Sequence, residues 1–193
     1  MTLMFKDQIK FNESFVGRDL RRADFSYSEF TECDFTSASL EKAEYLGAIF
    51  TRCNFDAALM DRGYLCGAQF IECSFIQTSI QNAYVFCTSF AKSQLIHTSF
   101  KDSMLSNVDL KDANIQTVEW AKGIINKPPV QLDGLDYPIT VYDNGYVQFG
   151  CTYNTKEWFL SAEGRDMTLL EGLKARRFWG KNRHWLVPFL ESL

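Results

Sequence analysis

The cysteines are the residues of this chain whose type and spacing first suggest chemistry. Three of its six cysteines, Cys33, Cys53 and Cys73, follow one another at intervals of twenty residues. They lie in three similar phrases, ECDF at 32–35, RCNF at 52–55 and ECSF at 72–75. Regularly spaced thiols can bind a metal ion, form disulfide bonds, or fill a repeated structural position. The choice depends on the elements that carry them.

A repeat of five residues extends through most of the chain. A large apolar residue stands at every fifth position from Phe15 to Trp120, for 22 consecutive units. Two residues before each of them stands a mostly small residue, such as Ala23 or Cys33, and the positions between are mostly polar. Neither the 3.6-residue period of a helix nor the alternation of a strand gives this pattern. It is expected of a solenoid in which four five-residue sides close one coil and both repeated residues point inward.

Several units match a known repeat motif: RADFS at 22–26, ECDFT at 32–36, RCNFD at 52–56 and DANIQ at 112–116. They resemble the pentapeptide-repeat family, whose consensus is Ala, Asp or Asn, Leu or Phe, and two variable residues. The resemblance implies an all-β fold, a right-handed quadrilateral β-helix. We expect an N-terminal lead-in over 1–12, the solenoid over 13–122, and a small α+β region over 123–193.

In such a solenoid the three repeated cysteines stack on one inner edge. Successive coils lie about 4.8 Å apart, like neighbouring strands. This spacing exceeds the usual Cβ separation of about 3.5–4.5 Å in a disulfide. Three parallel thiols also cannot form the tetrahedral shell of zinc. We therefore predict free, buried thiols that replace Ala as small hydrophobic residues, with no metal site and no cofactor.

A series of charged residues provides a second test of the register. Glu32, Arg52, Glu72, Lys92 and Asp112 are also twenty residues apart, and their charges alternate in sign. Stacked coils would place each charge beside opposite ones. The series therefore predicts a charge ladder on the outer surface.

Composition limits the function classes. The net charge is -4 and no apolar run reaches the 18 residues of a transmembrane helix, so we expect no direct nucleic-acid partner and no membrane insertion. Six cysteines without a visible signal peptide favour a cytoplasmic location, in a bacterial cell or a phage-infected host. No nucleotide-binding, metal-binding or nucleophile motif is present, so we predict no catalytic residues and no enzyme.

One predicted outer face is acidic in the N-terminal coils and apolar in the later coils. An outward apolar patch is typical of an interface. Instead of a partner protein, the C-terminal region of the same chain or a second copy of the chain in a homodimer could cover this patch. The candidate partner-binding residues are Asp24, Glu41, Glu44, Leu46, Tyr64, Tyr84, Phe86 and Met104.

The resemblance implies a non-catalytic protein-interaction module, and its quinolone-resistance members suggest a DNA-mimicking binder of a type II topoisomerase such as DNA gyrase. The charge agrees less well: residues 11–120 carry fifteen Asp and Glu and nine Lys and Arg, a net charge of -6. A duplex as long as the predicted rod, about 26 Å, would carry about 15 charges. The alternative is a phage- or prophage-encoded adaptor or inhibitor that binds another host protein through the apolar face or the C-terminal region.

The C-terminal region follows different patterns. Asn144-Gly145 predicts a hairpin over 138–150, and Thr155–Ser161 a short helix. A capping box at Thr168 predicts a helix to about Trp179 that ends at Gly180. Gly150-Cys151, Trp158 and Phe178-Trp179 resemble the tails of phage and prophage members of the family. We interpret the basic run over 173–183 as a solvated helix face rather than a nucleic-acid site.

Overall fold

The chain forms two compact units, Met1–Pro128 and Pro129–Leu193. Each is described by itself. The computed structural model describes residues 4–120, 123–125, 130–132, 139–149, 152–161 and 168–192.

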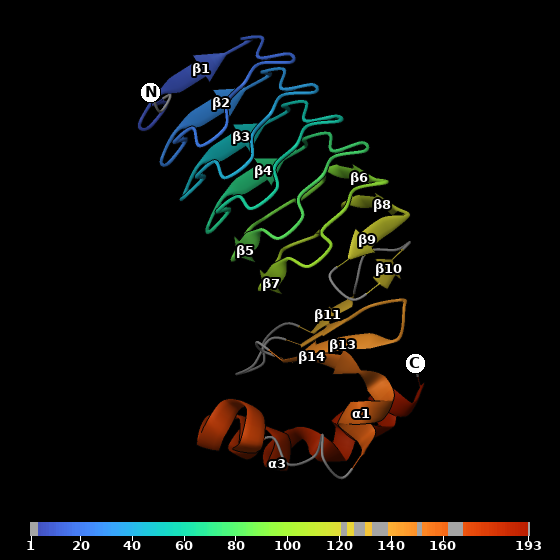
Figure 1. Cartoon of the computed structure of the whole chain (residues 1–193). Coiled ribbons are helices and arrows are strands. Elements are labelled where there is room, and N and C mark those ends of the chain that lie inside the picture. The colour runs from blue at the N-terminus through green and yellow to red at the C-terminus, as the bar shows by residue number, and fades with distance from the viewer. Residues whose placement is uncertain are drawn as a thin grey trace. The chain divides into compact units, whose positions relative to one another are not determined.

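In the first unit the backbone returns to itself every twenty residues. Met4, Ser14 and Asp19 each form a parallel bridge to the residue twenty positions later, and Ile9 pairs with Glu29 in the same way. The four pairings lie five residues apart, so each coil has four sides. The same spacing continues to the bridge between Ser99 and Glu119, which confirms the predicted solenoid (Figure 1).

The strands on the sides of the coils are short and parallel. One sheet consists, in order, of β1 (Ile9–Phe11), β2 (Glu29–Thr31), β3 (Ile49–Thr51) and β4 (Gln69–Ile71). Further along, β5 (Tyr84–Phe86) pairs with β7 (Met104–Ser106), and β6 (Gln94–Ile96) pairs with β8 (Asn114–Gln116). Strand β9 (Val118–Trp120) belongs to the last coil and pairs in antiparallel fashion with β10 (Gly123–Ile125).

The coiled structure includes residues that the apolar pattern leaves in the lead-in. Phe5 stacks on Phe25, with 5.0 Å between ring centroids. Lys10 lies in register with Phe30, in the series of inward positions, and its Nζ lies 2.9 Å from Glu13 Oε1. Because a charged residue stands where the repeat has an apolar one, the sequence pattern misses this coil.

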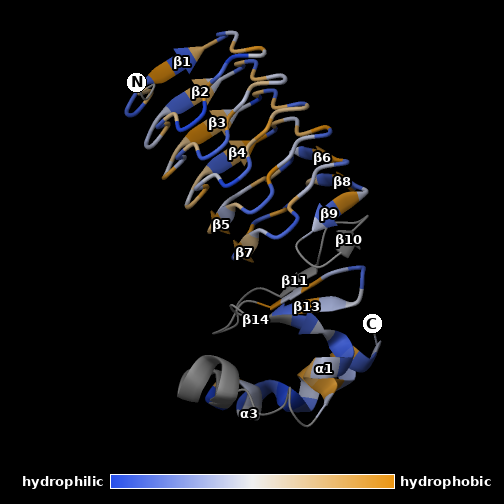
Figure 2. Cartoon of the chain, in the orientation of Figure 1, coloured by the Kyte–Doolittle hydropathy of each residue, from blue (hydrophilic) through white to orange (hydrophobic). Residues whose placement is uncertain are grey.

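Stacked aromatic rings form the core. Phe35, Phe55 and Phe75 are fully buried and stack at 4.8 and 5.1 Å between centroids, almost parallel. Rings on neighbouring sides meet edge to face, as Phe30 and Phe35 do at 5.6 Å. Both geometries stabilise aromatic pairs, by about 0.5–1.5 kcal/mol beyond burial alone. Figure 2 shows hydrophobic residues recurring in successive coils.

Every corner of the coil uses a left-handed backbone conformation. From Asp7 to Thr117, each fifth residue has a positive φ: twenty of these residues are not glycine, and Gly17, Gly47 and Gly67 complete the series. A left-handed residue other than glycine costs about 1–2 kcal/mol. Cross-coil hydrogen bonds offset this cost, as when Ala57 N donates to Ile76 O at 2.8 Å.

The second unit is a small α+β structure. Its antiparallel sheet has the order β11 (Val130–Leu132), β12 (Ile139–Val141), β13 (Tyr146–Phe149) and β14 (Thr152–Thr155). The β12–β13 hairpin turns through Gly145 at φ +82°, as predicted from Asn144-Gly145. Helix α1 (Lys156–Leu160) confirms the short predicted helix, and the Thr155 side chain caps it by accepting from Trp158 N. Gly150 and Cys151 lie outside the described residues.

The predicted end of the last helix at Gly180 is wrong. Helix α3 (Thr168–Ser192) continues through Gly180 and contains Pro188. Its Phe178, Trp179, Leu186 and Leu190 are buried with residues of β12, β13 and α1. This packing on both sides of Gly180 outweighs the roughly 1 kcal/mol that glycine costs inside a helix. Among the described residues, no helix has the length and apolar character needed to cross a membrane.

The corner conformation predicts opposite effects of glycine at two adjacent alanines. Ala57 is exposed with φ 55°, whereas Ala58 is fully buried. Ala57→Gly should leave the free energy of unfolding unchanged or raise it by up to about 1 kcal/mol, because relief of the left-handed strain exceeds the added chain entropy. Ala58→Gly should lower it by at least about 1 kcal/mol through lost burial and added entropy. Urea unfolding of both variants measures the contrast, and equal destabilisation would contradict the role assigned to the corners.

Candidate functional site

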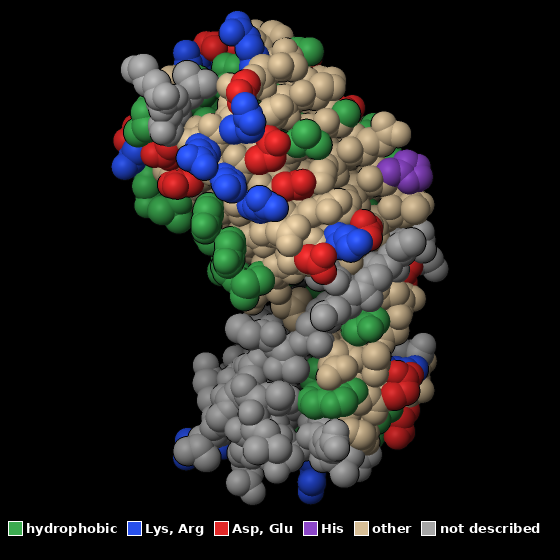
Figure 3. Space-filling view, viewed as in Figure 1, with side chains coloured by type: hydrophobic (Ala, Val, Ile, Leu, Met, Phe, Trp, Pro, Cys, Tyr) green, Lys and Arg blue, Asp and Glu red, His purple; other side chains and the backbone are tan. Residues whose placement is uncertain are grey.

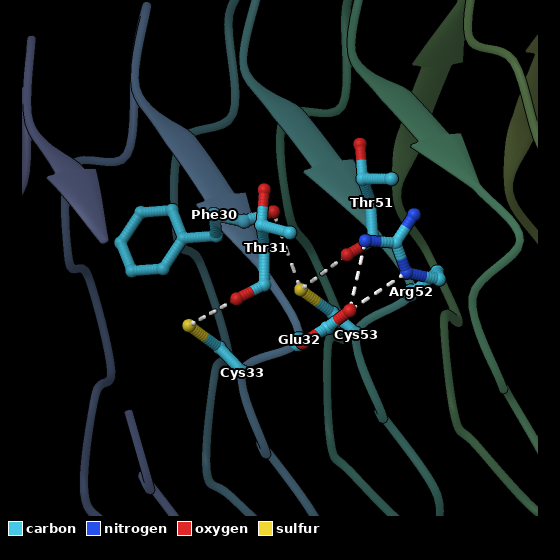
Figure 4. Close-up of polar contacts among 7 residues, drawn as sticks. All are labelled: Phe30, Thr31, Glu32, Cys33, Thr51, Arg52 and Cys53. Atoms are coloured by element: carbon cyan, nitrogen blue, oxygen red, sulfur yellow. Dashed lines mark hydrogen bonds and ion pairs between the residues drawn. The ribbon is translucent and has the colours of Figure 1, made fainter. Parts of the chain in front are cut away.

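The three repeated cysteines lie where the period places them. Cys33, Cys53 and Cys73 are buried and free. Cys53 Sγ donates to the carbonyl of Phe30 at 3.4 Å, and Cys73 Sγ donates to that of Phe50 at the same distance. Figure 4 shows the Cys53 contact. These two thiols therefore bind the carbonyl 23 residues before them, on the preceding coil, whereas Cys33 Sγ donates to the carbonyl of Thr31.

Hydroxyl groups make the same contact elsewhere in the solenoid. Thr78 donates to Phe55 O at 2.7 Å, Ser93 to Phe70 O at 3.0 Å and Thr98 to Phe75 O at 2.7 Å. The prediction that cysteine only replaces alanine is therefore incomplete, because the thiol also donates a hydrogen bond. The sequence does contain a sign of this hydrogen bond, because Cys, Ser and Thr recur at the same position of the repeat, two residues before the large apolar residue.

Two of the three buried thiols are poorly suited to catalysis. Burial raises the pKa of the Cys33 and Cys73 thiols, so both stay protonated at neutral pH. A hydrogen bond with Cys73 lowers the pKa of the Cys53 thiol, which is buried as well. Within the described part of the chain, no group of three or more His, Cys, Asp and Glu residues could hold a metal ion. The row of cysteines is thus part of the core.

The charge ladder forms ion pairs between neighbouring coils. Arg52 Nη2 lies 2.8 Å from Glu32 Oε1, and Lys92 Nζ lies 3.6 Å from Glu72 Oε1 (Figure 4 shows the first pair). All four side chains are about half exposed, so each pair is worth about 0–1 kcal/mol. The ladder supports the register and contributes little to stability.

The apolar candidate residues lie on four successive coils, all of them exposed except Phe86, which is half-buried. We call Leu46, Tyr64, Tyr84, Phe86 and Met104 the apolar column. Tyr64 bridges to Tyr84, which pairs with Met104, and the two tyrosine rings stack at 5.1 Å. Tyr64 is 48% exposed, Tyr84 39% and Met104 56%. Figure 3 shows hydrophobic side chains along the edge of the solenoid where β5 and β7 lie.

The sequence interpretation missed an extension of the column at a coil corner. Tyr27 is exposed, and its ring lies over Gly47, where an added Cβ would be 3.0 Å from Tyr27 Cδ1. Gly67 follows one coil later and also lacks a side chain. The corner beside Leu46 therefore carries no side chain on two successive coils, which leaves a flat surface there. In the sequence, the two glycines twenty residues apart could have indicated it.

The acidic candidates are less available than the sequence suggests. Asp24 bridges to Glu44, and Glu44 to Tyr64, so both acids continue the row of Tyr64. Asp24 Oδ1, however, accepts the backbone N–H of Ser26 at 2.9 Å. Glu41 lies around the coil corner from Glu44, and its Oε2 is buried without a hydrogen-bond partner among the described residues. Burial, and then the Glu41 charge, raise the pKa of Tyr45.

A row of cations lies between the acidic candidates. Arg22, Lys42 and Arg62 occupy successive corners, all three exposed. None of the ion pairs found among the described residues involves them. They separate Glu41 from the row of Asp24 and Glu44, so the N-terminal coils carry interleaved charges of both signs, as the upper part of Figure 3 shows.

Comparison with known proteins agrees with the geometry of the coils. A family model described as pentapeptide repeats matches residues 15–44 and 48–84, in eight copies. This part of the solenoid is similar to the pentapeptide-repeat family, as the sequence motifs indicate. A search of curated proteins found no significant match.

Three solved structures show a partial similarity to the chain. HetL of Nostoc sp. strain PCC 7120, described as involved in heterocyst differentiation regulation, is 18% identical over 64% of this chain, with a TM-score of 0.37. This chain spans 60% of the HetL chain. A thylakoid-lumen protein of Arabidopsis thaliana is 21% identical over 58% of this chain and 71% of its own, with a TM-score of 0.41. QnrB1, described as a plasmid-mediated fluoroquinolone resistance protein, is 17% identical over 62% of this chain and 91% of its own, with a TM-score of 0.33.

Burial predicts a large difference in thiol reactivity. Cys87 is exposed, whereas Cys53 and Cys73 are buried. Brief alkylation with iodoacetamide at pH 8 should label Cys87 at least tenfold faster than Cys53 or Cys73, because the reagent needs an accessible thiolate. Peptide mass spectrometry measures the labelling, and denaturant should abolish the difference. Equal labelling in the folded protein would contradict the buried row.

Proposed function

We propose that the protein is a non-catalytic interaction module that binds a protein partner through the apolar column. The observation that carries the proposal is the row of exposed Tyr64, Tyr84 and Met104 on three successive coils, with Leu46 exposed on the coil before them. A contiguous apolar patch of this kind is typical of a protein interface.

The solenoid also makes the column a favourable docking surface. The Tyr64 and Tyr84 rings are held in a stack by backbone pairing between their coils. Binding therefore orders few additional side chains, which lowers the entropic cost of association. Tyrosine is also among the residues that most often dominate binding energy.

The proposal predicts that single substitutions abolish binding without unfolding. Tyr84→Ala or Phe86→Asp should weaken partner capture from host lysate at least tenfold, because a central aromatic anchor contributes about 2 kcal/mol or more. Gln94→Ala changes an exposed residue of β6 and should leave capture unchanged. Thermal unfolding of each variant checks the fold. Capture that survives both column substitutions and removal of 121–193 would refute the assignment.

A second candidate function is mimicry of duplex DNA on a type II topoisomerase such as DNA gyrase. The net charge of -6 over 11–120 and the stacking of Asp24 on Glu44 favour it. The row of Arg22, Lys42 and Arg62 between the acids places it second. The phage-like tail resemblance adds a third option, an adaptor or inhibitor acting on another host protein.

Opposite charge changes test the mimicry. Asp24→Asn keeps the acceptor for Ser26 N–H, and combined with Glu41→Gln and Glu44→Gln it removes three negative charges. This variant should inhibit gyrase supercoiling several-fold less than the parent, whereas Arg22→Gln with Lys42→Gln and Arg62→Gln should inhibit more strongly. Inhibition should also weaken as salt rises. Full supercoiling activity in a large molar excess of the parent protein would rule out mimicry.

A further inference from the structure

The exposed side of α3 presents cations on a rigid helix. Phe178, Trp179, Leu186 and Leu190 bury one side of the helix in the core of the second unit. The opposite side exposes, in chain order, Arg177, Gly180, Lys181, His184, Pro188 and Glu191. At 3.6 residues per turn, these six positions lie within an arc of about 100°, with the single acid in the last turn of the helix. We call Arg177, Lys181 and His184 the basic stripe.

The stripe lies in a segment with a strong excess of positive charge. Residues 172–190 contain five Lys and Arg and no Asp or Glu, although the whole chain has a net charge of -4. Arg177, Lys181 and Arg183 take part in none of the ion pairs found among the described residues. Unlike Arg22, Lys42 and Arg62 on the solenoid, they are not interleaved with acids in the sequence. Such a segment creates a local positive potential that attracts polyanions.

Gly180 lies at one edge of the exposed side, one turn from Arg177 and next to Lys181, and the described residues give no reason for a glycine there. The residue is helical, and a Cβ built on it would have no atom of the described residues within 4 Å. Alanine would stabilise an exposed helix interior by about 1 kcal/mol. Neither a left-handed conformation nor crowding explains the missing side chain. What glycine does provide is a bare backbone surface beside Arg177, Lys181 and His184.

We propose that the basic stripe binds the phosphodiester backbone of a nucleic acid, with Gly180 allowing close approach. Arg and Lys donate charge-assisted hydrogen bonds to phosphate oxygens. A membrane surface fits less well, because the apolar side of α3 is buried in the core and has nothing to insert. Contacts to phosphate alone are independent of sequence and strongly salt-dependent. The proposal replaces the interpretation of 173–183 as a solvated face and the expectation of no direct nucleic-acid partner.

Salt-dependent binding of the full chain tests the proposal. Fluorescence anisotropy with a labelled 20-base-pair DNA duplex, repeated with a single-stranded RNA, should show affinity falling steeply between 25 and 200 mM NaCl. Arg177→Gln with Lys181→Gln should reduce the slope of log affinity against log salt by roughly two, about one per lost phosphate contact. Lys101→Gln with Lys111→Gln removes the same charge from exposed solenoid positions and should leave the slope unchanged.

A substitution that conserves charge tests the role of the glycine. Gly180→Gln should raise the thermal stability of α3 and still weaken duplex binding several-fold, because its side chain blocks close approach. Absence of binding at 25 mM NaCl, or equal slope losses in the two double variants, would overturn the proposal. So would unchanged affinity in Gly180→Gln, equally tight binding of polyglutamate, or binding to phosphatidylglycerol vesicles without binding to the duplex.

Discussion

Backbone hydrogen bonds between successive coils are the constraint on which the rest of the solenoid depends. Phe35 N donates to Asn54 O at 2.7 Å, and Asn54 N donates back to Cys33 O at 3.0 Å. Repeated on every side, these bonds align each residue with the one twenty positions later. Aromatic stacks, thiol contacts, ion pairs and the apolar column all follow from this alignment. Each coil also relies on its neighbours, because a single coil leaves its backbone groups and its inward side chains without partners.

Much of the solenoid could be predicted because its signal is repeated many times. A period of five with apolar residues in phase indicates the coil, the core and the stacking of Cys33 on Cys53. Two features could not be predicted in this way. Lys10 occupies a core-series position because its ammonium reaches Glu13 at the first described coil, and no periodic pattern anticipates a charge there. The left-handed corners are invisible because many residue types occupy them, held by cross-coil hydrogen bonds rather than by their own preference.

Prediction was weaker where a single residue carried it. A glycine after a helical pattern often ends the helix. At Gly180, however, aromatic and leucine side chains on both sides of the glycine pack into one core and keep α3 continuous. The same limit applies to the candidate surface. The twenty-residue spacing predicted that Tyr64, Tyr84 and Met104 lie together. It did not show that the Asp24 carboxylate accepts a hydrogen bond from the backbone N–H of Ser26. Nor did it show that one oxygen of Glu41 is buried, since both depend on side-chain orientation.

The ion pair of the first described coil has a consequence for self-assembly. Parallel solenoids have edges that can in principle pair with another molecule and grow into fibres. A second molecule stacked coaxially on this coil would bury the Lys10 ammonium and the Glu13 carboxylate, which are now 29% and 42% exposed. Removing both charges from water would cost several kcal/mol unless new partners replaced it. The pair therefore opposes the stacking of a second molecule on this coil.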